Sequence, residues 1–129
     1  MKNSNKGQSL VEFGLVVVML VLLLAGTVDF GWVFGGIHTI NNAAREGARV
    51  ASITADVPPG TRLAKVTARV NAVAVSFCGT PTVTVSPSTV SGEPIVTVNA
   101  TCPVTFPISG KTINLTSSSS FRDETKAGS

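Results

Sequence analysis

One acidic side chain, Glu12, stands at the start of the longest apolar stretch in this 129-residue sequence. From Phe13 to Val28 that stretch contains no charged residue and no proline. An ionised carboxylate costs up to about 2.5–3.5 kcal/mol when it is driven to the centre of a bilayer. A plain membrane anchor or a signal peptide gains nothing from such a residue, so Glu12 is a candidate functional residue.

The other ionisable and nucleophilic residues lack the arrangements that enzymes use. The sequence has no Ser-His-Asp set, no CxxC motif and no metal-ligand cluster, and its paired carboxylates occur only at Asp123-Glu124. His38 has no ligand partner at metal spacing. The net charge is +3, but the ten basic residues are scattered, which does not indicate a nucleic-acid surface. We therefore expect no enzyme, no catalytic residue, no metal, no cofactor and no nucleic-acid partner.

A membrane-spanning helix is predicted to carry Glu12, because only a helix satisfies its own backbone polar groups in lipid. The charge-free run from Phe13 to Val28 spans about 24 Å, slightly less than a hydrocarbon core of about 30 Å. Good helix formers continue to about Ala55, and Pro58-Pro59-Gly60 follow. We expect one long helix over residues 8–55.

The outer end of this helix is expected to lie in the membrane interface, where aromatic rings prefer to be. Phe30, Trp32 and Phe34 supply such rings, and Asp29 lies among them. Two interpretations of Asp29 remain: a solvated interfacial acid, or a contact between subunits.

The orientation follows from Lys2 and Lys6, which precede the apolar run without any acidic residue. Positive residues hold that end in the cytoplasm, so the C-terminal part should lie outside. A cleaved signal peptide would need a small-x-small site after an apolar core of about 7–15 residues. The candidate, Leu24-Ala25-Gly26-Thr27, is poor because Asp29 and a continuing helical pattern follow it.

Three motifs follow one another along this helix: Gly7-Gln8-Ser9-Leu10-Val11-Glu12-Phe13, Asp29-Phe30-Gly31, and Ala43-Ala44-Arg45-Glu46-Gly47-Ala48-Arg49. Together they resemble the TadE-like family, small pilin-like proteins of the tight-adherence (Tad) pilus system. The similarity covers roughly residues 7 to 55. The sequence departs from the family in having Val18-Met19 where a proline is frequent, and Trp32 where a basic residue is frequent.

The resemblance implies that a prepilin peptidase cuts after Gly7 and leaves Gln8 as the first mature residue. The Glu12 carboxylate, beside Phe13, could then pair with the new amino terminus of a neighbouring subunit, which removes both charges from lipid together. The implied partners are other pilin-like subunits, the prepilin peptidase, the pilus assembly platform and the membrane.

Small residues recur every four positions along the helix and form what we call the small-residue row: Gly31, Gly35, Thr39, Ala43, Gly47 and Ala51. In lipid, such a row lets another helix approach closely. Each helix glycine costs about 1 kcal/mol relative to alanine, which indicates compensation by contact. We expect assembly contacts at Gly31, Gly35, Ala43 and Gly47.

Arg45 and Arg49 lie four residues apart on one helix face, and Glu46 lies within reach of Arg49. A solvated pair of this kind is worth only a few tenths of a kcal/mol. The alternative is that Arg45 and Arg49 are further assembly contacts.

The second half of the sequence predicts a short helix and a small antiparallel sheet, which makes the fold class α+β. From Thr61 to Ala74 the basic residues share one helix face and the apolar residues share the other: Arg62, Lys65 and Arg69 against Leu63, Val66, Val70 and Val73. Residues 82–85 and 95–98 alternate with period two around turn-forming residues, which indicates a hairpin. Residues 111–121 are expected to form a third strand.

Cys78 and Cys102 flank the hairpin, and we expect a disulfide between them because a head of roughly 75 residues has a marginal core. If they lay opposite each other in a regular ladder, Val83 would face Thr97 and mix the two faces of the sheet. We therefore expect either a bulge, or cysteines outside the regular ladder near Gly79 and Pro103.

With the cut that the resemblance implies, we expect a leader at residues 1–7, the long helix at 8–55, and an extracytoplasmic head at 56–129 with the disulfide and a flexible C-terminal tail. The predicted function is that of a membrane-inserted, pilin-like structural subunit that assembles through its N-terminal helix for surface adhesion. The alternative is a single-span binding module that does not assemble.

Overall fold

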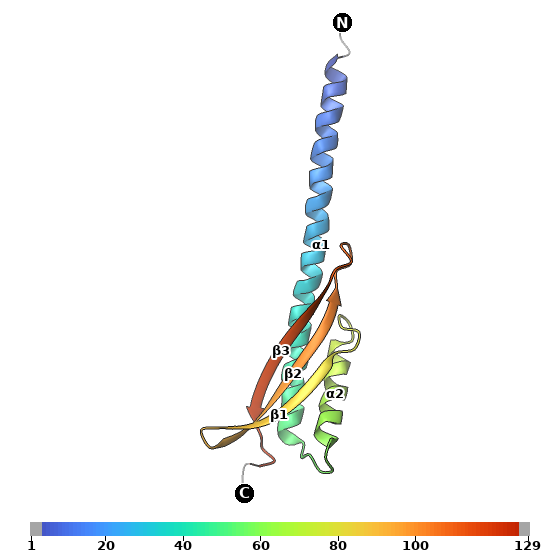
Figure 1. Ribbon diagram of the computed structural model, residues 1–129. Helices are drawn as coiled ribbons and strands as arrows, with labels where there is room; N and C mark the ends of the chain where they lie inside the picture. Colours follow the sequence, from blue (N-terminus) through green and yellow to red (C-terminus); the bar gives the residue numbers. More distant parts are fainter. Residues whose placement is uncertain (1–3, 127–129) are drawn as a thin grey trace.

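The computed structural model describes residues 4–126, and the side chains from Gly7 to Lys126. Along the chain come α1 (Ser4–Ile53), α2 (Thr61–Ala74), β1 (Thr82–Val90), β2 (Glu93–Thr105) and β3 (Thr112–Arg122) (Figure 1). A long apolar helix, a short helix and a three-stranded antiparallel sheet confirm the predicted α+β fold. The start of the predicted leader, residues 1–3, and the last three residues of the predicted tail lie outside the described residues.

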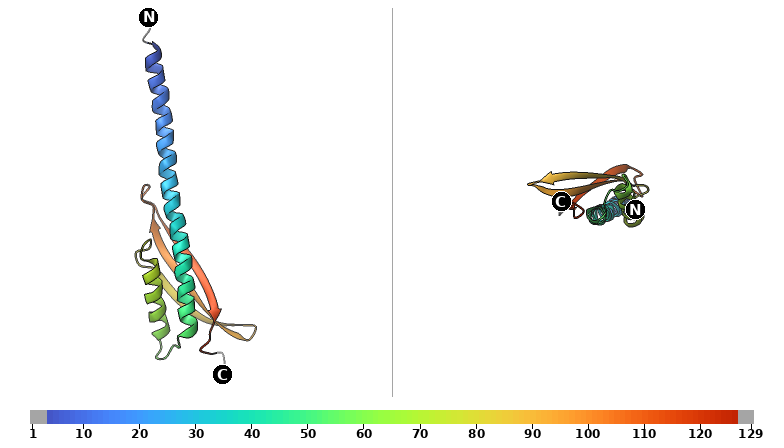
Figure 2. Two further views of the ribbon diagram at one scale, coloured as in Figure 1. Left: turned by 180° about the vertical axis from the view of Figure 1, so that it is seen from behind. Right: turned by 90° about the horizontal axis from the view of Figure 1, so that it is seen from below.

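The helix α1 runs past all other elements. Its N-terminal half extends away from the head, whereas its C-terminal half lies beside α2 and the sheet (Figures 1 and 2). It ends at Ile53, close to the predicted end at Ala55. Asp56 accepts hydrogen bonds from the backbone N–H groups of Gly60 and Arg62, at 2.9 and 3.1 Å, and so supports the start of α2.

The sheet has the order β1-β2-β3, with both helices on one of its faces (Figure 2). Ser91 and Gly92 connect β1 to β2 with φ of 52° and 86°. Positive φ at both positions is what a two-residue type I′ turn requires. Val85 pairs with Val98 and Val83 with Ala100, so the valines share one face as the alternation predicted.

The core forms where alternate residues of β2 meet the two helices. Five of its side chains are buried, those of Val96, Val98, Ala100, Cys102 and Val104. They pack against small residues of α1 and one stripe of α2: Ala43, Ala44, Ala48, Ala51, Val66, Val70 and Ala74. Alanines on α1 let the backbones of helix and sheet come close, and the opposite face of the sheet is rich in threonine and serine.

The helix α2 has the predicted bounds, but one of its predicted faces is wrong. Arg62 is buried, whereas Leu63, which was placed on the apolar face, is 44% exposed. Arg62 tolerates burial because Asp123 and Thr125, from the chain after β3, accept its hydrogen bonds. Arg122 ends β3 and Asp123 is buried, so the described part of the C-terminal segment packs on the head at Asp123, and the flexible C-terminal tail stays a prediction.

A disulfide joins Cys78 and Cys102, whose Cα atoms lie 5.5 Å apart. Cys78 precedes β1 and is outside the ladder, as expected. Cys102 lies inside the ladder, opposite Leu115 of β3, and the pairing of β1 with β2 has no bulge, so neither expected alternative, a bulge or both cysteines outside the ladder, is correct as stated. Alternation along β2 puts Cys102 on the helix-facing side of the sheet, where the connection from α2 brings Cys78.

Candidate functional site

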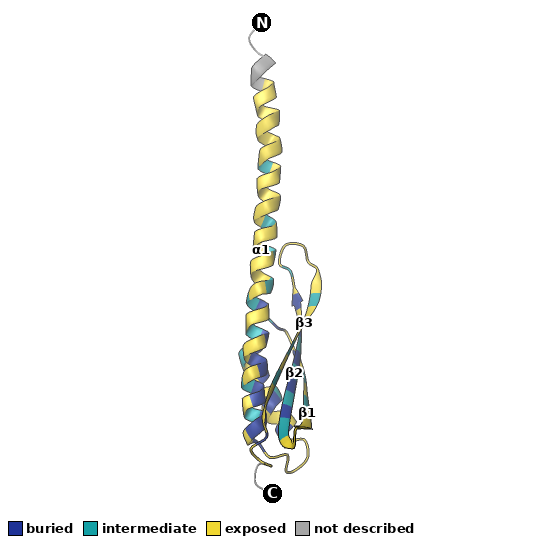
Figure 3. Ribbon diagram, turned by 90° about the vertical axis from the view of Figure 1, so that its left-hand side faces the viewer, coloured by how far each residue is buried: buried dark blue, intermediate teal, exposed yellow. Residues whose placement is uncertain are grey.

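The N-terminal half of α1 has an apolar surface that the rest of the chain leaves uncovered (Figure 3). Most large side chains along it are exposed by half or more, from Leu10 at 73% to Val28 at 53%. The most apolar window of this helix is 0% buried within the chain, and the helix is long and apolar enough to cross a membrane. An apolar surface of this extent marks a membrane or protein contact, and this helix suggests a membrane anchor.

The three residues predicted for processing and pairing lie close together at the start of this surface. Gly7 is exposed, and a Cβ added to it would meet no atom within 4 Å. The side-chain amide of Gln8 donates a hydrogen bond to Oε1 of Glu12 at 3.4 Å. Such a long hydrogen bond is weak. The Glu12 carboxylate and the neighbouring Phe13, which is 68% exposed, are therefore accessible to a second chain.

Most of the small-residue row is occupied by the head of the same chain. A Cβ on Gly47 would lie 2.7 Å from Cγ2 of Val70, and one on Gly35 would lie 2.9 Å from Cζ of Phe77. Ala43 and Ala51 are fully buried. Compensation of the helix glycines by contact is correct at Gly35 and Gly47, but the contact is intramolecular, because α2 and the sheet pack on this side. The assembly contacts expected at these positions stay a prediction, and Gly31 alone among the four is open in the described part of the chain.

The three charged residues of the third motif do not form one group. Glu46 pairs with Arg69 of α2, with 3.1 Å between Oε2 and Nη2, so the predicted pair with Arg49 is wrong. Both side chains are substantially exposed, at 40% and 51%, so this link between α1 and α2 is screened by solvent. Arg45 and Arg49 are exposed, and neither makes an ion pair within the described part of the chain. Their assembly role stays a prediction.

Asp29 has a role that neither sequence interpretation included. Its Oδ1 accepts a hydrogen bond from the backbone N–H of Ile108 at 2.9 Å, and its Oδ2 one from Ser109 at 3.1 Å. These residues lie in the loop between β2 and β3. Asp29 therefore fastens that loop to α1, and the contact joins residues too distant in the sequence for any local pattern to have indicated it.

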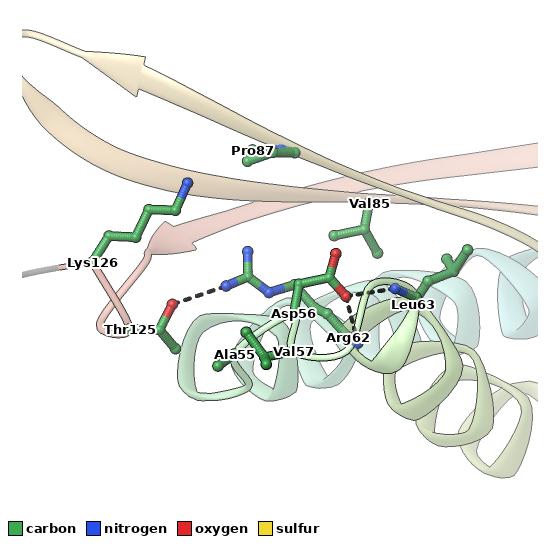
Figure 4. Close-up of a pocket in the computed structure, with 10 residues that line it drawn as sticks. Ala55, Asp56, Val57, Arg62, Leu63, Val85, Pro87, Thr125 and Lys126 are labelled. Carbon is green, nitrogen blue, oxygen red and sulfur yellow. Dashed lines mark hydrogen bonds between the residues drawn. The ribbon is translucent and has the colours of Figure 1, made fainter.

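A second polar centre lies at the far end of the head, around Arg62. Its Nε donates to the carbonyl oxygen of Thr54 at 2.7 Å, and its two terminal nitrogens donate to Asp123 at 2.9 and 3.2 Å. Nη2 also donates to Oγ1 of Thr125 at 2.9 Å (Figure 4). Burial acts to raise the pKa of Asp123, but hydrogen bonds from Thr125 and Arg62, and the charge of Arg62, together hold that pKa below its usual value.

A cavity of about 560 Å³ opens beside this centre, lined in part by Asp56, Arg62, Leu63, Thr125 and Lys126 (Figure 4). The guanidinium of Arg62 is already committed to partners of its own chain, so its evident role is structural. Within residues 4–126, no three His, Cys, Asp or Glu side chains are placed to hold a metal ion.

Comparison with known proteins gives one finding. A family model described as TadE-like protein matches residues 7–49, which confirms the resemblance seen in the three motifs. No curated protein and no solved structure matches the chain. The matched segment contains Gly7, Glu12 and all of the uncovered apolar surface of α1, and the family suggests a protein associated with the Tad pilus.

Proposed function

We propose that the chain is a structural, pilin-like subunit of a Tad pilus, cut after Gly7 by a prepilin peptidase and assembled through α1 for surface adhesion. The observation that carries this proposal is the uncovered apolar surface of α1 from Leu10 to Val28, which has Glu12 near its start and falls within the TadE-like match. Before assembly, lipid would cover this surface. In the pilus, the helices of neighbouring subunits would cover it.

The geometry at the start of α1 supports the proposed transfer of α1 from lipid into a pilus. A cut after Gly7 would place a positive amino group on Gln8, one helical turn from Glu12. The hydrogen bond from Gln8 is long and weak, so it leaves the Glu12 carboxylate accessible to the amino group of a neighbouring subunit. Pairing would let both charges enter an apolar bundle, where an unpaired charge is strongly unfavourable.

The head would then be carried outside the membrane, tied to α1 by its core, while the disulfide joins the segment after α2 to β2 within the head. The open Gly31 and the exposed Arg45 and Arg49 are further positions where neighbouring subunits would meet α1. The alternative, a single-span binding module that does not assemble, requires neither a cut after Gly7 nor a carboxylate at position 12.

The test is the identity of the mature N-terminus. Intact-mass measurement of membrane-extracted protein is expected to show a chain that begins at Gln8. Gly7→Leu should block the cut, because the peptidase must fit a small residue before the bond. Gly14→Leu is the matched control, since Gly14 also has no atom within 4 Å of an added Cβ. A Gly7→Leu protein that still begins at Gln8 would overturn the proposed processing.

A further inference from the structure

We propose that the loop between β2 and β3, residues 106–111, is a second membrane contact that lies in the outer lipid interface beside α1. We call it the β2–β3 loop. The proposal rests on the membrane insertion of α1 described above. Figure 1 shows this loop as the part of the head that reaches furthest along α1 toward the N-terminus, and Figure 3 shows it from a second side.

The depth of the loop relative to the bilayer follows from its hydrogen bonds to Asp29. The charge-free run before Asp29 spans about 24 Å, and a hydrocarbon core of about 30 Å needs a further turn of helix. The outer edge of the hydrocarbon therefore falls near residues 29–32. Because the N–H groups of Ile108 and Ser109 bond to the Asp29 carboxylate at 2.9 and 3.1 Å, the tip of the loop lies at the same level.

The backbone of the loop is suited to a place with little water. Pro107 has no N–H, and the N–H groups of Ile108 and Ser109 bond to Asp29. The N–H of Gly110 bonds to the carbonyl oxygen of Phe106 at 3.1 Å, and that of Phe106 to Lys111 at 2.8 Å. No backbone donor from Phe106 to Gly110 thus depends on water, as is required near lipid, where an unsatisfied donor is costly.

The side chains around the loop match the same environment. Ile108 is 54% exposed at the tip, and no charged residue occurs from Pro103 to Gly110. On α1, aromatic rings stand at the level of Asp29: Phe30, Trp32 and Phe34, with the Trp32 ring 5.0 Å from that of Phe77. Tryptophan is enriched at membrane interfaces. Lys111, exposed where the loop returns to the sheet, is placed to meet anionic headgroups.

The opposite end of the head differs in chemistry. The turn between β1 and β2 is followed by Glu93, which forms an exposed ion pair with Arg122. Val90, next to this turn, is 54% exposed, the same fraction as Ile108. The two positions therefore provide a matched pair: equal exposure within the chain, at opposite ends of the head.

The experiment uses tryptophan fluorescence, because Trp32 is the only tryptophan in the sequence. In a Trp32→Phe background, Ile108→Trp and Val90→Trp each place a single tryptophan at one end of the head. The full chains are reconstituted in phosphatidylcholine–phosphatidylglycerol vesicles, with or without brominated acyl chains. We expect brominated lipid to quench Ile108→Trp by about twofold or more, with protection from aqueous iodide. For Val90→Trp we expect aqueous iodide to quench the fluorescence and brominated lipid to leave it unchanged.

The parent protein, which keeps Trp32, distinguishes a failure of the loop contact from a failure of α1 to insert into the membrane. Quenching of Trp32 by brominated lipid, together with an Ile108→Trp protein that behaves like Val90→Trp, overturns the loop contact and leaves the insertion of α1 intact. If brominated lipid quenches neither Trp32 nor the tryptophan of Ile108→Trp, both the loop contact and the membrane insertion of α1 are overturned. Protection of Ile108→Trp from iodide without lipid quenching shows that protein, such as a second copy of the chain, covers the loop, and it too overturns the proposal.

Discussion

The guanidinium of Arg62 makes two hydrogen bonds, of 2.9 and 3.2 Å, to the carboxylate of Asp123, 61 residues further along the chain. Only 7% of the Arg62 side chain and 1% of the Asp123 side chain are exposed. The backbone N–H of Asp123 also donates to the carbonyl oxygen of Pro94 at 2.8 Å, and that of Glu124 to Ser52 at 3.0 Å. The pair therefore joins the start of α2 to the chain that follows β3, and the backbone N–H groups of Asp123 and Glu124 join that chain to β2 and α1.

Removing one partner should destabilise the head strongly, because the other charge would stay buried without compensation. We expect Asp123→Ala to lower the free energy of unfolding by about 3–5 kcal/mol. Arg122→Ala is the control, since its pair with Glu93 is exposed and should contribute about 0–1 kcal/mol. Urea unfolding in a constant concentration of detergent measures both. Equal effects of the two substitutions would contradict the structural role of the Arg62–Asp123 pair.

The stability of the head should depend on pH through Asp123. Its folded-state pKa lies below the usual value of 3.8, because the hydrogen bonds and the charge of Arg62 outweigh burial. A carboxyl with a depressed folded-state pKa stabilises the fold fully above its unfolded-state pKa of about 3.9, and this contribution is lost as the pH falls from there through the folded-state pKa. We expect the stability of Asp123→Asn to depend less on pH below about pH 4 than that of the wild type. Parallel curves for wild type and Asp123→Asn would rule out this contribution.

The disulfide should contribute a measurable part of the stability of the head. Cys78 and Cys102 close a loop with a sequence separation of 24, for which loop-closure entropy gives about 3 kcal/mol. We expect the Cys78→Ala/Cys102→Ala double variant to lose about 2–4 kcal/mol in urea unfolding. Protein from an oxidising compartment should gain the mass of two hydrogen atoms on reduction. Free-thiol labelling of both cysteines before reduction would contradict the bond.

Gly47 and Gly31 belong to the same row of α1 and should respond differently to a methyl group. At Gly47 the new Cβ would lie 2.7 Å from Val70 and 3.3 Å from Val66, so the packing against α2 must shift. We expect Gly47→Ala to destabilise the head by about 1–3 kcal/mol, the usual cost of overpacking. Gly31→Ala, with nothing within 4 Å of its Cβ, should leave the head unchanged in the same measurement. Equal stability of the two variants would show that the head does not use Gly47 for close packing.

The elements of the fold could be predicted because their signals are local. The apolar run, the period of α2 and the alternation of the strands each repeat within a few residues, and the structure places α2 at the predicted Thr61–Ala74. The same alternation correctly put Val83 and Val85 on one face with Val96 and Val98. It also runs through Cys102, which therefore could have been placed inside the strand.

The contacts that join distant segments could not be predicted in this way. Arg62 shares its local pattern with Lys65 and Arg69, and only a partner 61 residues away makes its burial favourable. The same holds for Asp29, whose partners are the backbone N–H groups of a loop about 80 residues later. The small-residue row correctly indicated close packing, but a row on one helix does not specify whether another subunit or the chain's own head fills it.

Glu12 should be needed for assembly and dispensable for membrane insertion. A carboxylate at the edge of an apolar helix makes insertion less favourable, so Glu12→Leu should reach the membrane at a normal or raised level. In the assembled pilus, the amino group of a neighbour's Gln8 would then enter the helix bundle without a counter-charge, and breaking a buried pair costs about 3–5 kcal/mol. We expect Glu12→Leu to be cut after Gly7 and to expose its head, yet to fail to crosslink or co-purify with pilus components. Glu12→Lys should be worse, because it adds repulsion to the missing pair. Gln8→Ala removes the side-chain hydrogen bond from Gln8 to Glu12 but keeps both charges, so it should assemble normally. If Glu12→Leu inserts and assembles as the wild type does, the pairing role is wrong, and the single-span anchor becomes the better explanation of α1.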